Sequence, residues 1–316
     1  MLNIGIASKG RIQDQTFEFL KTIGLPVRTA NGRSYSAGID ALSNSQIWLL
    51  PANEIAKRLH SGDLHVGITG HDLLLEIGEV EDKVSLLEPL GFAQADLVVA
   101  VPNSWIDVAS IADLREVFAD IRQRMNRAPQ VATKYTRIVR ERFLEEGISD
   151  FRIVADPGAT EAAPLRGIAD VIVDITTTGD TLRANDLKPL SDAILSSEAW
   201  LAASTKREIW TEIAFSELAK VMTRITSFKD NRTLIRFAPD SDTEALRNAI
   251  RAAFDASTTG LNFAGSGLIY VSKSEAFEVA SFLQNQTGSP IGVFQPDLIL
   301  DQKSEALERF RAEVFV

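Results

Sequence analysis

The segment from residue 161 to residue 182 decides the fold class of this chain. It reads Glu161-Ala-Ala-Pro164-Leu-Arg-Gly167-Ile-Ala-Asp170-Val-Ile-Val-Asp174-Ile-Thr176-Thr177-Thr178-Gly179-Asp180-Thr181-Leu182. The apolar run before Asp174 predicts a buried strand that ends in a carboxylate. The turn of hydroxyl and glycine residues that follows predicts the start of a helix.

This strand-to-helix turn is suited to a sugar phosphate. A helix N-terminus presents unpaired N–H groups and a positive dipole end, and the threonine hydroxyls add donors for a phosphate. Asp174 is placed to accept hydrogen bonds from vicinal sugar hydroxyls. The alternative interpretation is a plain helix cap in a surface turn, because short motifs often match by chance.

Working outward, the first 230 residues alternate short apolar runs with amphipathic stretches, which predicts an α/β fold with mostly parallel sheets. The expected strands are Asn3–Ala7, Gln46–Leu50, Leu64–Ile68, Asp96–Val101, Gln130–Ala132, Phe151–Val154 and Ala169–Ile175. The expected helices are Gln13–Ile23, Ala52–Ser61, Ile111–Asn126 and Thr136–Glu146. Thr136 is expected to cap the last of these helices and Gly147 to end it.

The final 90 residues follow a different order. The predicted elements are a strand Thr233–Phe237, a helix Asp242–Phe254, strands Leu261–Phe263 and Leu268–Val271, a helix Ser274–Gln286 and a strand Ile291–Phe294. A terminal helix is expected near Lys303–Val314. The order β-α-β-β-α-β is the ferredoxin-like pattern. The polar stretch Arg224–Thr233 is the expected boundary before it.

Composition excludes several classes of protein. The chain has 316 residues, 33 basic and 43 acidic side chains and a net charge of −10, which argues against a nucleic-acid coat or a membrane-surface binder. It has no cysteine, so thiolate catalysis and Cys-ligated metals are excluded. The N-terminus lacks the features of a signal peptide, and no apolar run reaches the roughly 18 to 20 residues of a membrane helix. We therefore expect a cytoplasmic protein.

Four segments, in order, resemble the ATP phosphoribosyltransferase family. They are Ala7-Ser8-Lys9-Gly10-Arg11, Gly67-Ile68-Thr69-Gly70-His71-Asp72-Leu73-Leu74, Ala132-Thr133-Lys134-Tyr135-Thr136-Arg137-Ile138 and the 161–182 segment. Each match is weak alone, but four ordered matches are specific. The tail, with Ile269–Ser272 and Gly288–Phe294, is similar to the regulatory domain of the family's long form.

The resemblance implies both the reaction and the residues of the site. In this family, N1 of the ATP adenine displaces pyrophosphate from C1 of phosphoribosyl pyrophosphate (PRPP), with Mg²⁺ held chiefly by substrate oxygens. Such a displacement depends on positioning and electrostatic stabilisation. The residues implied in catalysis are Lys9 and Asp174. Those implied in PRPP binding are Glu161, Asp174, Thr176, Thr177, Thr178, Gly179, Asp180 and Thr181. Those implied in ATP binding are Gly10, Arg11, Arg33, Thr69, Gly70, Asp72, Lys134 and Tyr135.

The resemblance also implies an architecture and partners. We expect a two-lobed, periplasmic-binding-protein-like α/β catalytic unit followed by a ferredoxin-like α+β domain. Residues 1–95 and 185–225 would form the first lobe, 96–184 the second, and 226–316 the regulatory domain. The resemblance implies histidine as feedback inhibitor and a homo-oligomer, a dimer or a hexamer.

Structural interpretations stay open for several of these residues. Asp72 suits a helix cap, and Lys134 suits a solvated charge beside a core tyrosine. Arg33 can equally be a surface charge. Glu161 can equally be a carboxylate that interacts favourably with the dipole of the short helix that begins near Pro164. The three histidines do not share a helical face, so we expect no metal site from them.

One stretch departs from the family. Pro51-Ala52-Asn53-Glu54-Ile55 contains no arginine, so Lys57, Arg58 or Arg33 would have to meet ATP there. Two non-catalytic interpretations therefore stay open: a two-lobed small-molecule binder and a degraded regulatory homologue. The intact 174–182 loop argues against the second.

Overall fold

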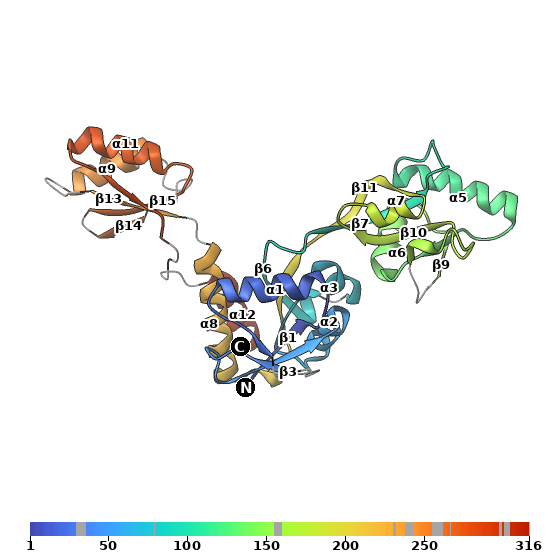
Figure 1. Cartoon of the computed structure of the whole chain (residues 1–316), viewed down its shortest axis with the longest axis horizontal. Coiled ribbons are helices and arrows are strands. Elements are labelled where there is room, and N and C mark those ends of the chain that lie inside the picture. Colours follow the sequence, from blue (N-terminus) through green and yellow to red (C-terminus); the bar gives the residue numbers. More distant parts are fainter. Residues whose placement is uncertain are drawn as a thin grey trace. The chain divides into compact units, whose positions relative to one another are not determined.

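The chain divides into two compact units. The structure, a computed structural model, describes residues 1–29, 36–78, 80–154, 160–229, 232–237, 243–254, 262–265, 267–296, 299 and 304–315. The first unit contains Met1–Leu218 and Ala306–Val316, and the second contains Ala219–Glu305. The first unit holds two sheets, each with its own helices, which we call the first and second lobes (Figure 1).

The first lobe is built on a seven-stranded sheet in the order β2-β3-β4-β1-β5-β12-β6. Its strands are β1 (Leu2–Ala7), β2 (Arg28–Thr29), β3 (Ser36–Gly38), β4 (Ser45–Leu50), β5 (Val66–Gly70), β6 (Val84–Pro89) and β12 (Ala199–Ser204). Its helices are α1 (Arg11–Thr22), α2 (Ala52–Ser61), α3 (His71–Ile77) and α4 (Val80–Lys83). The strands β4, β1 and β5 are parallel, and the other neighbours in the sheet pair antiparallel.

Helix α2 packs close to the middle of this sheet because two strands carry glycine beneath it. A Cβ at Gly67 would lie 2.4 Å from Ile55 Cγ2 of α2, and one at Gly5 would lie 3.1 Å from the same atom and 2.6 Å from Leu64 Cδ1, which follows the helix. Real Cβ atoms do not approach so closely, so a larger side chain at either position would push the helix away. Ile55 and Leu64 are buried as a result.

The second lobe is built on a five-stranded sheet in the order β11-β7-β10-β8-β9. Its strands are β7 (Ala95–Pro102), β8 (Gln130–Ala132), β9 (Arg152–Val154), β10 (Val171–Thr176) and β11 (Leu187–Ser197). Its helices are α5 (Ile111–Met125), α6 (Thr136–Glu145), the short 3₁₀ helix η1 (Thr160–Ala162) and α7 (Asp180–Ala184).

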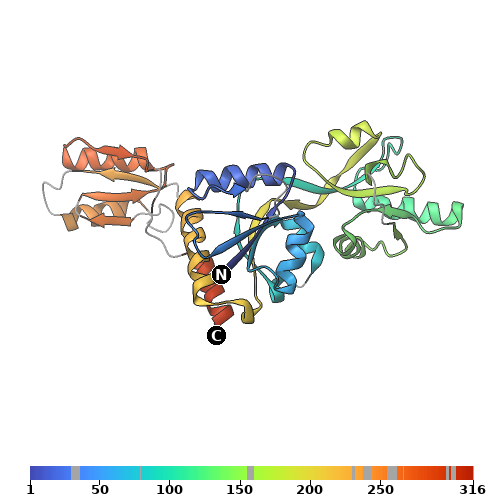
Figure 2. The same cartoon turned by 60° about the horizontal axis from the view of Figure 1, so that its bottom comes forward.

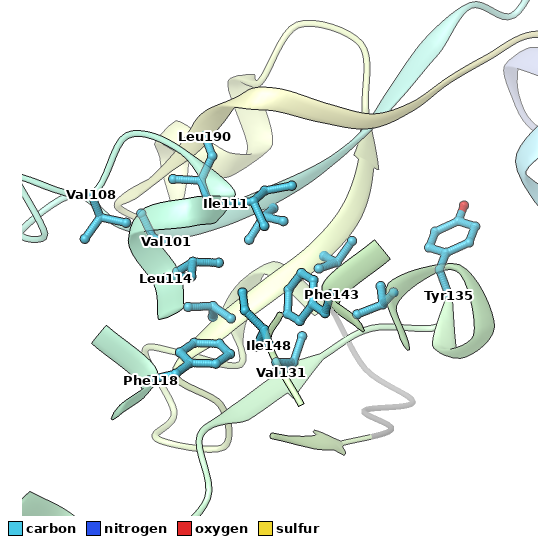
Figure 3. Close-up of a cluster of buried hydrophobic side chains, with 14 of the residues drawn as sticks. Val101, Val108, Ile111, Leu114, Phe118, Val131, Tyr135, Phe143, Ile148 and Leu190 are labelled. Carbon is cyan, nitrogen blue, oxygen red and sulfur yellow. The ribbon is translucent and has the colours of Figure 1, made fainter. Parts of the chain in front are cut away.

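A continuous apolar core fixes the elements of the second lobe. It joins residues of the central strands, such as Val101 and Val131, to Leu114 and Phe118 of α5 and Phe143 of α6 (Figure 3). Figure 3 shows Tyr135 at the edge of this cluster, with its hydroxyl turned away from it. That orientation leaves the tyrosine's polar atom available to a partner outside the core.

The C-terminal unit has the ferredoxin-like order that the sequence predicts. It consists of β13 (Thr233–Arg236), α9 (Thr243–Ala253), β14 (Asn262–Gly265), β15 (Leu268–Val271), α11 (Ala276–Thr287) and β16 (Gly292–Phe294). The strand order is β14-β15-β13-β16, with every pair antiparallel. Figure 1 shows α9 and α11 on the same side of this sheet. Ile250, Val279 and Leu283 pack there against Ile235 and Ile269.

The last helix returns to the first unit. After a 3₁₀ helix η2 (Arg207–Ile209), α8 (Glu212–Lys229) leads out of the first unit, and α12 (Glu305–Phe315) lies beside it (Figure 2). The Phe310 ring packs edge-on against Trp210, and Phe315 packs against Phe215. Arg311 pairs with Glu212 at 3.2 Å. Aromatic packing therefore joins the end of the chain to the first unit.

The structure confirms most predicted elements and corrects others. The expectation of mostly parallel sheets is wrong: β7 runs antiparallel to both of its neighbours, β10 and β11. The physical reason is that β7 carries the chain into the second lobe and β11 carries it out. Thr136 is not a cap but the first residue of α6, after Tyr135. Gly147, with φ of +72°, follows the end of that helix as expected.

The compact units and sheets have their own bounds. The strand β11 pairs with β7, so residues 187–197 belong to the second lobe's sheet. The C-terminal unit runs from Ala219 to Glu305. The three-domain division of the sequence stays a prediction. None of the described helices is both long and apolar enough to cross a membrane.

Candidate active site

A cavity of about 590 Å³ opens where strands of the two lobes end. Most of the site residues expected from the sequence line it. They are Arg11, Gly70, Asp72, Lys134, Tyr135, Glu161, Asp174, Thr176, Thr177, Thr178, Asp180 and Thr181. Lys9, Gly10, Thr69 and Gly179 are absent from its lining, and Arg33 lies outside the described residues.

Asp174 is the carboxylate that the second lobe presents to this cavity. It lies near the end of β10, where burial of the strand gives way to partial exposure, and its side chain is 19% exposed. Its Oδ1 accepts a hydrogen bond from the Ile175 N–H at 2.8 Å and lies 3.4 Å from Lys134 Nζ. The carboxylate thus faces the cavity beside a cation, an arrangement that can hold a hydroxylated and negatively charged ligand.

The turn after Asp174 is shaped by its own hydrogen bonds. The Gly179 N–H donates to Thr176 Oγ1 at 3.0 Å, and Thr178 Oγ1 donates to Asp180 Oδ2 at 2.6 Å. Gly179 has φ of +73°, a left-handed conformation that favours glycine. Gly179 is the cap residue directly before α7, and it shapes the turn without lining the cavity.

Arg183 completes this turn from inside α7. Its Nη2 donates to the Thr178 carbonyl at 2.9 Å and to Asp180 Oδ1 at 2.5 Å. The Thr178 hydroxyl and then Arg183 lower the pKa of Asp180. Thr177 and Thr181 are exposed, and within the described residues their hydroxyls have no hydrogen bond. These two hydroxyls are therefore the donors that the turn offers to a ligand.

The turn after β5 contributes differently. Thr69 is fully buried, and its Oγ1 donates to the Ala52 carbonyl at 2.9 Å. Asp72 is only 4% exposed: its Oδ2 accepts from the Tyr135 hydroxyl and its Oδ1 from Ser197 Oγ, both at 2.7 Å. The Asp72 N–H in turn donates to Ser197 Oγ at 3.1 Å. The sequence left open whether Asp72 binds ATP or caps a helix. In the structure, protein hydroxyls occupy both oxygens of its carboxylate.

Tyr135 joins the two lobes through this contact. Burial, and then the charge of Asp72, raise the pKa of Tyr135. The phenol therefore stays protonated and donates to the carboxylate at neutral pH. Lys134 Nζ lies 5.4 Å from the centre of the Tyr135 ring. Lys134 thus places a cation in the cavity, and Tyr135 donates its hydroxyl hydrogen to Asp72.

The first lobe supplies Arg11 at the cavity edge. Arg11 is exposed and its Nη2 donates to the Gln94 carbonyl at 3.1 Å. Of the groups considered as substitutes for the missing arginines, Arg58 pairs with Glu54 at 2.9 Å. Neither Arg58 nor Lys57 lines the cavity. Among the described cavity residues, Arg11 and Lys134 are the cations.

Sequence analysis missed Ser197, the second partner of Asp72. It lies at the end of β11, 125 residues from Asp72, and only the pairing of β11 in the sheet brings it there. No local motif marks it, because a serine at a strand end is common. Glu161, by contrast, was expected and lines the cavity from η1.

Comparison with known proteins agrees with the sequence resemblance. The family model described as HisG, ATP phosphoribosyltransferase, matches residues 51–227. An ATP phosphoribosyltransferase of Caulobacter vibrioides is 40% identical over 96% of this chain and 95% of its own length. One of Nitrobacter winogradskyi is 38% identical over 100% of this chain and 98% of its own.

A solved structure shows the same fold. It is titled the ATP phosphoribosyl transferase (HisG:HisZ) complex from Thermotoga maritima, and it matches with a TM-score of 0.53 and 24% identity. The match covers 72% of this chain and 99% of that one. The two-lobed α/β fold that the sequence predicts is confirmed.

Proposed function

Because this chain belongs to the ATP phosphoribosyltransferase family, we propose a residue-level account of its reaction in the cavity described above. The chain is an enzyme of the first step of histidine biosynthesis, and its relatives of similar length are consistent with the long form of the family. With the family established, the two non-catalytic interpretations are no longer needed.

The proposed reaction is a displacement at C1 of PRPP. A bond forms between N1 of the ATP adenine and C1, the C1–O bond to pyrophosphate breaks, and its electron pair leaves with the pyrophosphate. Positive charge develops on the ribosyl group and negative charge on the leaving oxygen. A site for this reaction must therefore hold a hydroxylated sugar, two phosphorylated groups and their charges in one orientation.

The single observation that carries the proposal is the position of Asp174 beside Lys134 in the cavity. The partly exposed carboxylate suits the ribose hydroxyls, and its negative charge stabilises the developing ribosyl cation. The exposed hydroxyls of Thr177 and Thr181, with the turn ordered by Thr176 and Gly179, suit the 5-phosphate. Thr178 and Asp180 would support this turn.

Cations and the remaining lining residues account for the other groups. Lys134 and Arg11 would meet phosphate oxygens of the pyrophosphate or of ATP, and Glu161 would order a neighbouring hydroxyl. On the strength of the family resemblance we retain Lys9 as a catalytic residue, and Gly10 and Gly70 as ATP-side contacts. Thr69 would contribute only as a buried support for the turn, because its hydroxyl is already bonded to Ala52.

Mg²⁺ fits this cavity as an ion carried by the substrates. Within the described residues, no cluster of three or more His, Cys, Asp or Glu side chains can hold a metal. Asp72 is satisfied by protein partners and Asp180 is paired with Arg183, which leaves Asp174 and Glu161 as possible ligands. When bound, Mg²⁺ would neutralise the charge of the pyrophosphate.

A direct assay tests this account. The full chain is incubated with ATP, PRPP and Mg²⁺, and phosphoribosyl-ATP is followed by absorbance. We expect product formation that depends on both substrates and stops when a chelator removes Mg²⁺. Turnover that continues unchanged with the chelator would contradict the role of Mg²⁺, and the absence of any product would contradict the reaction.

We also propose that the C-terminal unit binds histidine and that the protein is a homo-oligomer, a dimer or a hexamer. The proposal for histidine is supported by the C-terminal unit, which is compact and has a hydrophobic core of its own. None of its described residues lines the cavity. Inhibition of the full chain by L-histidine, with sedimentation measured with and without histidine, tests both parts. Activity that is unchanged at millimolar histidine would contradict the inhibitor. The use of ATP as a substrate is consistent with a cytoplasmic location, which we propose as well.

A further inference from the structure

Helix α3 packs on both lobes of the catalytic unit. It follows β5 of the first lobe, and its Leu74 is buried in that lobe's core. Leu75, the next residue, packs against the core of the second lobe. Successive residues of a short helix point in different directions, so α3 can bury one side in each lobe. The helix α3 therefore contacts the cores of both lobes.

The N-terminus of α6, in the second lobe, has no cap of its own. Tyr135 occupies the cap position, and its side chain makes no capping hydrogen bond. The first N–H groups of a helix have no partner within the helix, and Ser, Thr, Asp or Asn usually supplies one at this position. A tyrosine here means that the capping group must come from elsewhere.

Glu76 of α3 supplies that cap from the first lobe. Its Oε1 accepts from the Arg137 N–H and from Thr136 Oγ1, each at 3.0 Å, and its Oε2 accepts from the Ile138 N–H at 3.1 Å. A carboxylate at a helix N-terminus also interacts favourably with the helix dipole. Both oxygens of Glu76 are thus committed to the start of α6.

A second contact runs in the opposite direction. Arg137, inside α6, donates from Nε to the Leu75 carbonyl at 3.0 Å and also from Nη2 to the same carbonyl. That carbonyl is near the end of α3, where a cation is favourable. The carboxylate of α3 and the guanidinium of α6 therefore form a reciprocal clasp between the lobes, which we call the Glu76–Arg137 clasp.

The clasp lies directly beside the cavity without lining it. Lys134 and Tyr135, the two residues before α6, line the cavity, whereas Glu76 and Arg137 do not. Fixing the first turn of α6 fixes these two residues, and Lys134 Nζ then lies 3.4 Å from Asp174. We propose that Glu76 is a positioning residue that holds Lys134 in its place opposite Asp174. The inference depends on the roles proposed above for Lys134 and Asp174.

Two variants and a matched control test the position of Glu76. Glu76→Ala removes all three accepted bonds, and Glu76→Gln keeps a carbonyl acceptor. Glu145→Ala, the control, removes an exposed carboxylate from the far end of α6. We expect kcat to fall roughly 10- to 100-fold in Glu76→Ala, because a displacement of about 1 Å can cost that much. Glu76→Gln should retain part of the rate, and Glu145→Ala should match the wild type.

A merely structural role would give a different pattern. Kinetics are measured well below the melting temperature of each variant, with folding followed by circular dichroism. A lower melting temperature with wild-type kcat would overturn the proposal. If Glu76→Ala fails to fold, Glu76→Gln carries the same comparison.

A double-mutant cycle identifies the residue through which Glu76 acts. If it acts through Lys134, Glu76→Ala combined with Lys134→Ala should lose no more activity than Lys134→Ala alone. Combined with Arg11→Ala, the two losses should multiply. Multiplying losses with Lys134→Ala would overturn the inference while leaving the proposed function intact. An unchanged Lys134→Ala would instead overturn the proposed role of Lys134, and the inference with it.

Discussion

Two strand-to-helix turns of the catalytic unit have similar sequences and different structures. At the first junction, β5 ends in Thr69 and Gly70, and Asp72 lies in the first turn of α3. At the second, Asp174 lies near the end of β10, and Thr177, Thr178 and Gly179 lead into α7. Each combines a buried strand with hydroxyl, glycine and acidic residues at a helix start. At the first junction the side chains of Thr69 and Asp72 are bonded to protein groups, and at the second the exposed hydroxyls of Thr177 and Thr181 have no such bond among the described residues.

The difference lies in the tertiary partners of the two carboxylates. Both oxygens of Asp72 accept hydrogen bonds from protein hydroxyls, and the residue is buried. In the described part of the chain, both contacts of Asp174 involve Oδ1, which leaves Oδ2 for a ligand. We therefore expect the first acid to contribute to stability and the second to ligand binding, and mutagenesis can separate the two roles.

The largest expected effect is on catalysis. Asp174→Asn removes the charge that faces the proposed ribose site. We therefore expect kcat/KM for PRPP to fall by a factor that corresponds to a loss of about 2 to 4 kcal/mol of transition-state binding energy. The melting temperature should stay near that of the wild type. The absorbance assay for phosphoribosyl-ATP and a thermal melt measure the two quantities. Asp150→Asn, an exposed carboxylate outside the cavity, is the control. An unchanged kcat/KM would remove Asp174 from the site.

The next effect is on stability. Tyr135→Phe leaves one oxygen of Asp72 buried without its donor, so we expect the free energy of unfolding to fall by about 1 to 3 kcal/mol. Urea denaturation followed by circular dichroism measures it. Tyr270→Phe removes the same hydroxyl from a less buried position and serves as the control. Equal losses in the two variants would show that the Asp72 contact contributes nothing.

The smallest effect depends on pH and concerns the opposite end of β10. Asp170 accepts two hydrogen bonds from Arg127, at 2.6 and 2.7 Å, and one from the Gln130 N–H at 2.7 Å. Burial would raise the pKa of Asp170, but these bonds outweigh it and lower the pKa. The stabilisation is therefore fully present above the unfolded-state pKa near 4 and is lost as pH falls towards the folded-state value.

Asp170→Asn provides the measurement for this strand end. We expect the variant to be about 1 kcal/mol less stable than the wild type at pH 6, since a charge-assisted contact is lost. The gap should narrow below about pH 4, because the carboxylate of the unfolded wild-type chain takes up a proton there and the folded one does so only at lower pH. Urea unfolding at pH 6 and pH 3 measures both values. A gap that stays constant with pH would contradict the role of the Asp170 charge.

Local patterns predicted much of the fold. The apolar run of β10, the amphipathic α5 and the β-α-β-β-α-β order of the C-terminal unit are each encoded in neighbouring residues. The direction of β7 was predicted wrongly, because an apolar run indicates burial on both faces and not the direction of neighbouring strands. The helix at the end of the chain was expected, but nothing in its sequence indicated Trp210 and Phe215 as partners.

The candidate site divides in the same way. Asp174, Thr177 and Thr181 lie on one short segment, so a motif can indicate that they face one ligand. Ser197 and Glu76 have no such motif, because their partners are 125 and about 60 residues away in the chain. The pairing of β11 places Ser197 beside Asp72, and the packing of α3 against the second lobe places Glu76 at the start of α6.

The sequence by itself determined the family, the order of the elements and the turn that offers hydroxyls and a carboxylate. These follow from the periodicity and chemistry of residues close together in the chain. The tertiary structure alone decided that Asp72 is satisfied internally, that Glu76 caps a helix of the other lobe, and that α12 returns to the catalytic unit. The physical reason is that a polar group takes the partner that folding places within hydrogen-bond distance, and chain position does not specify that partner.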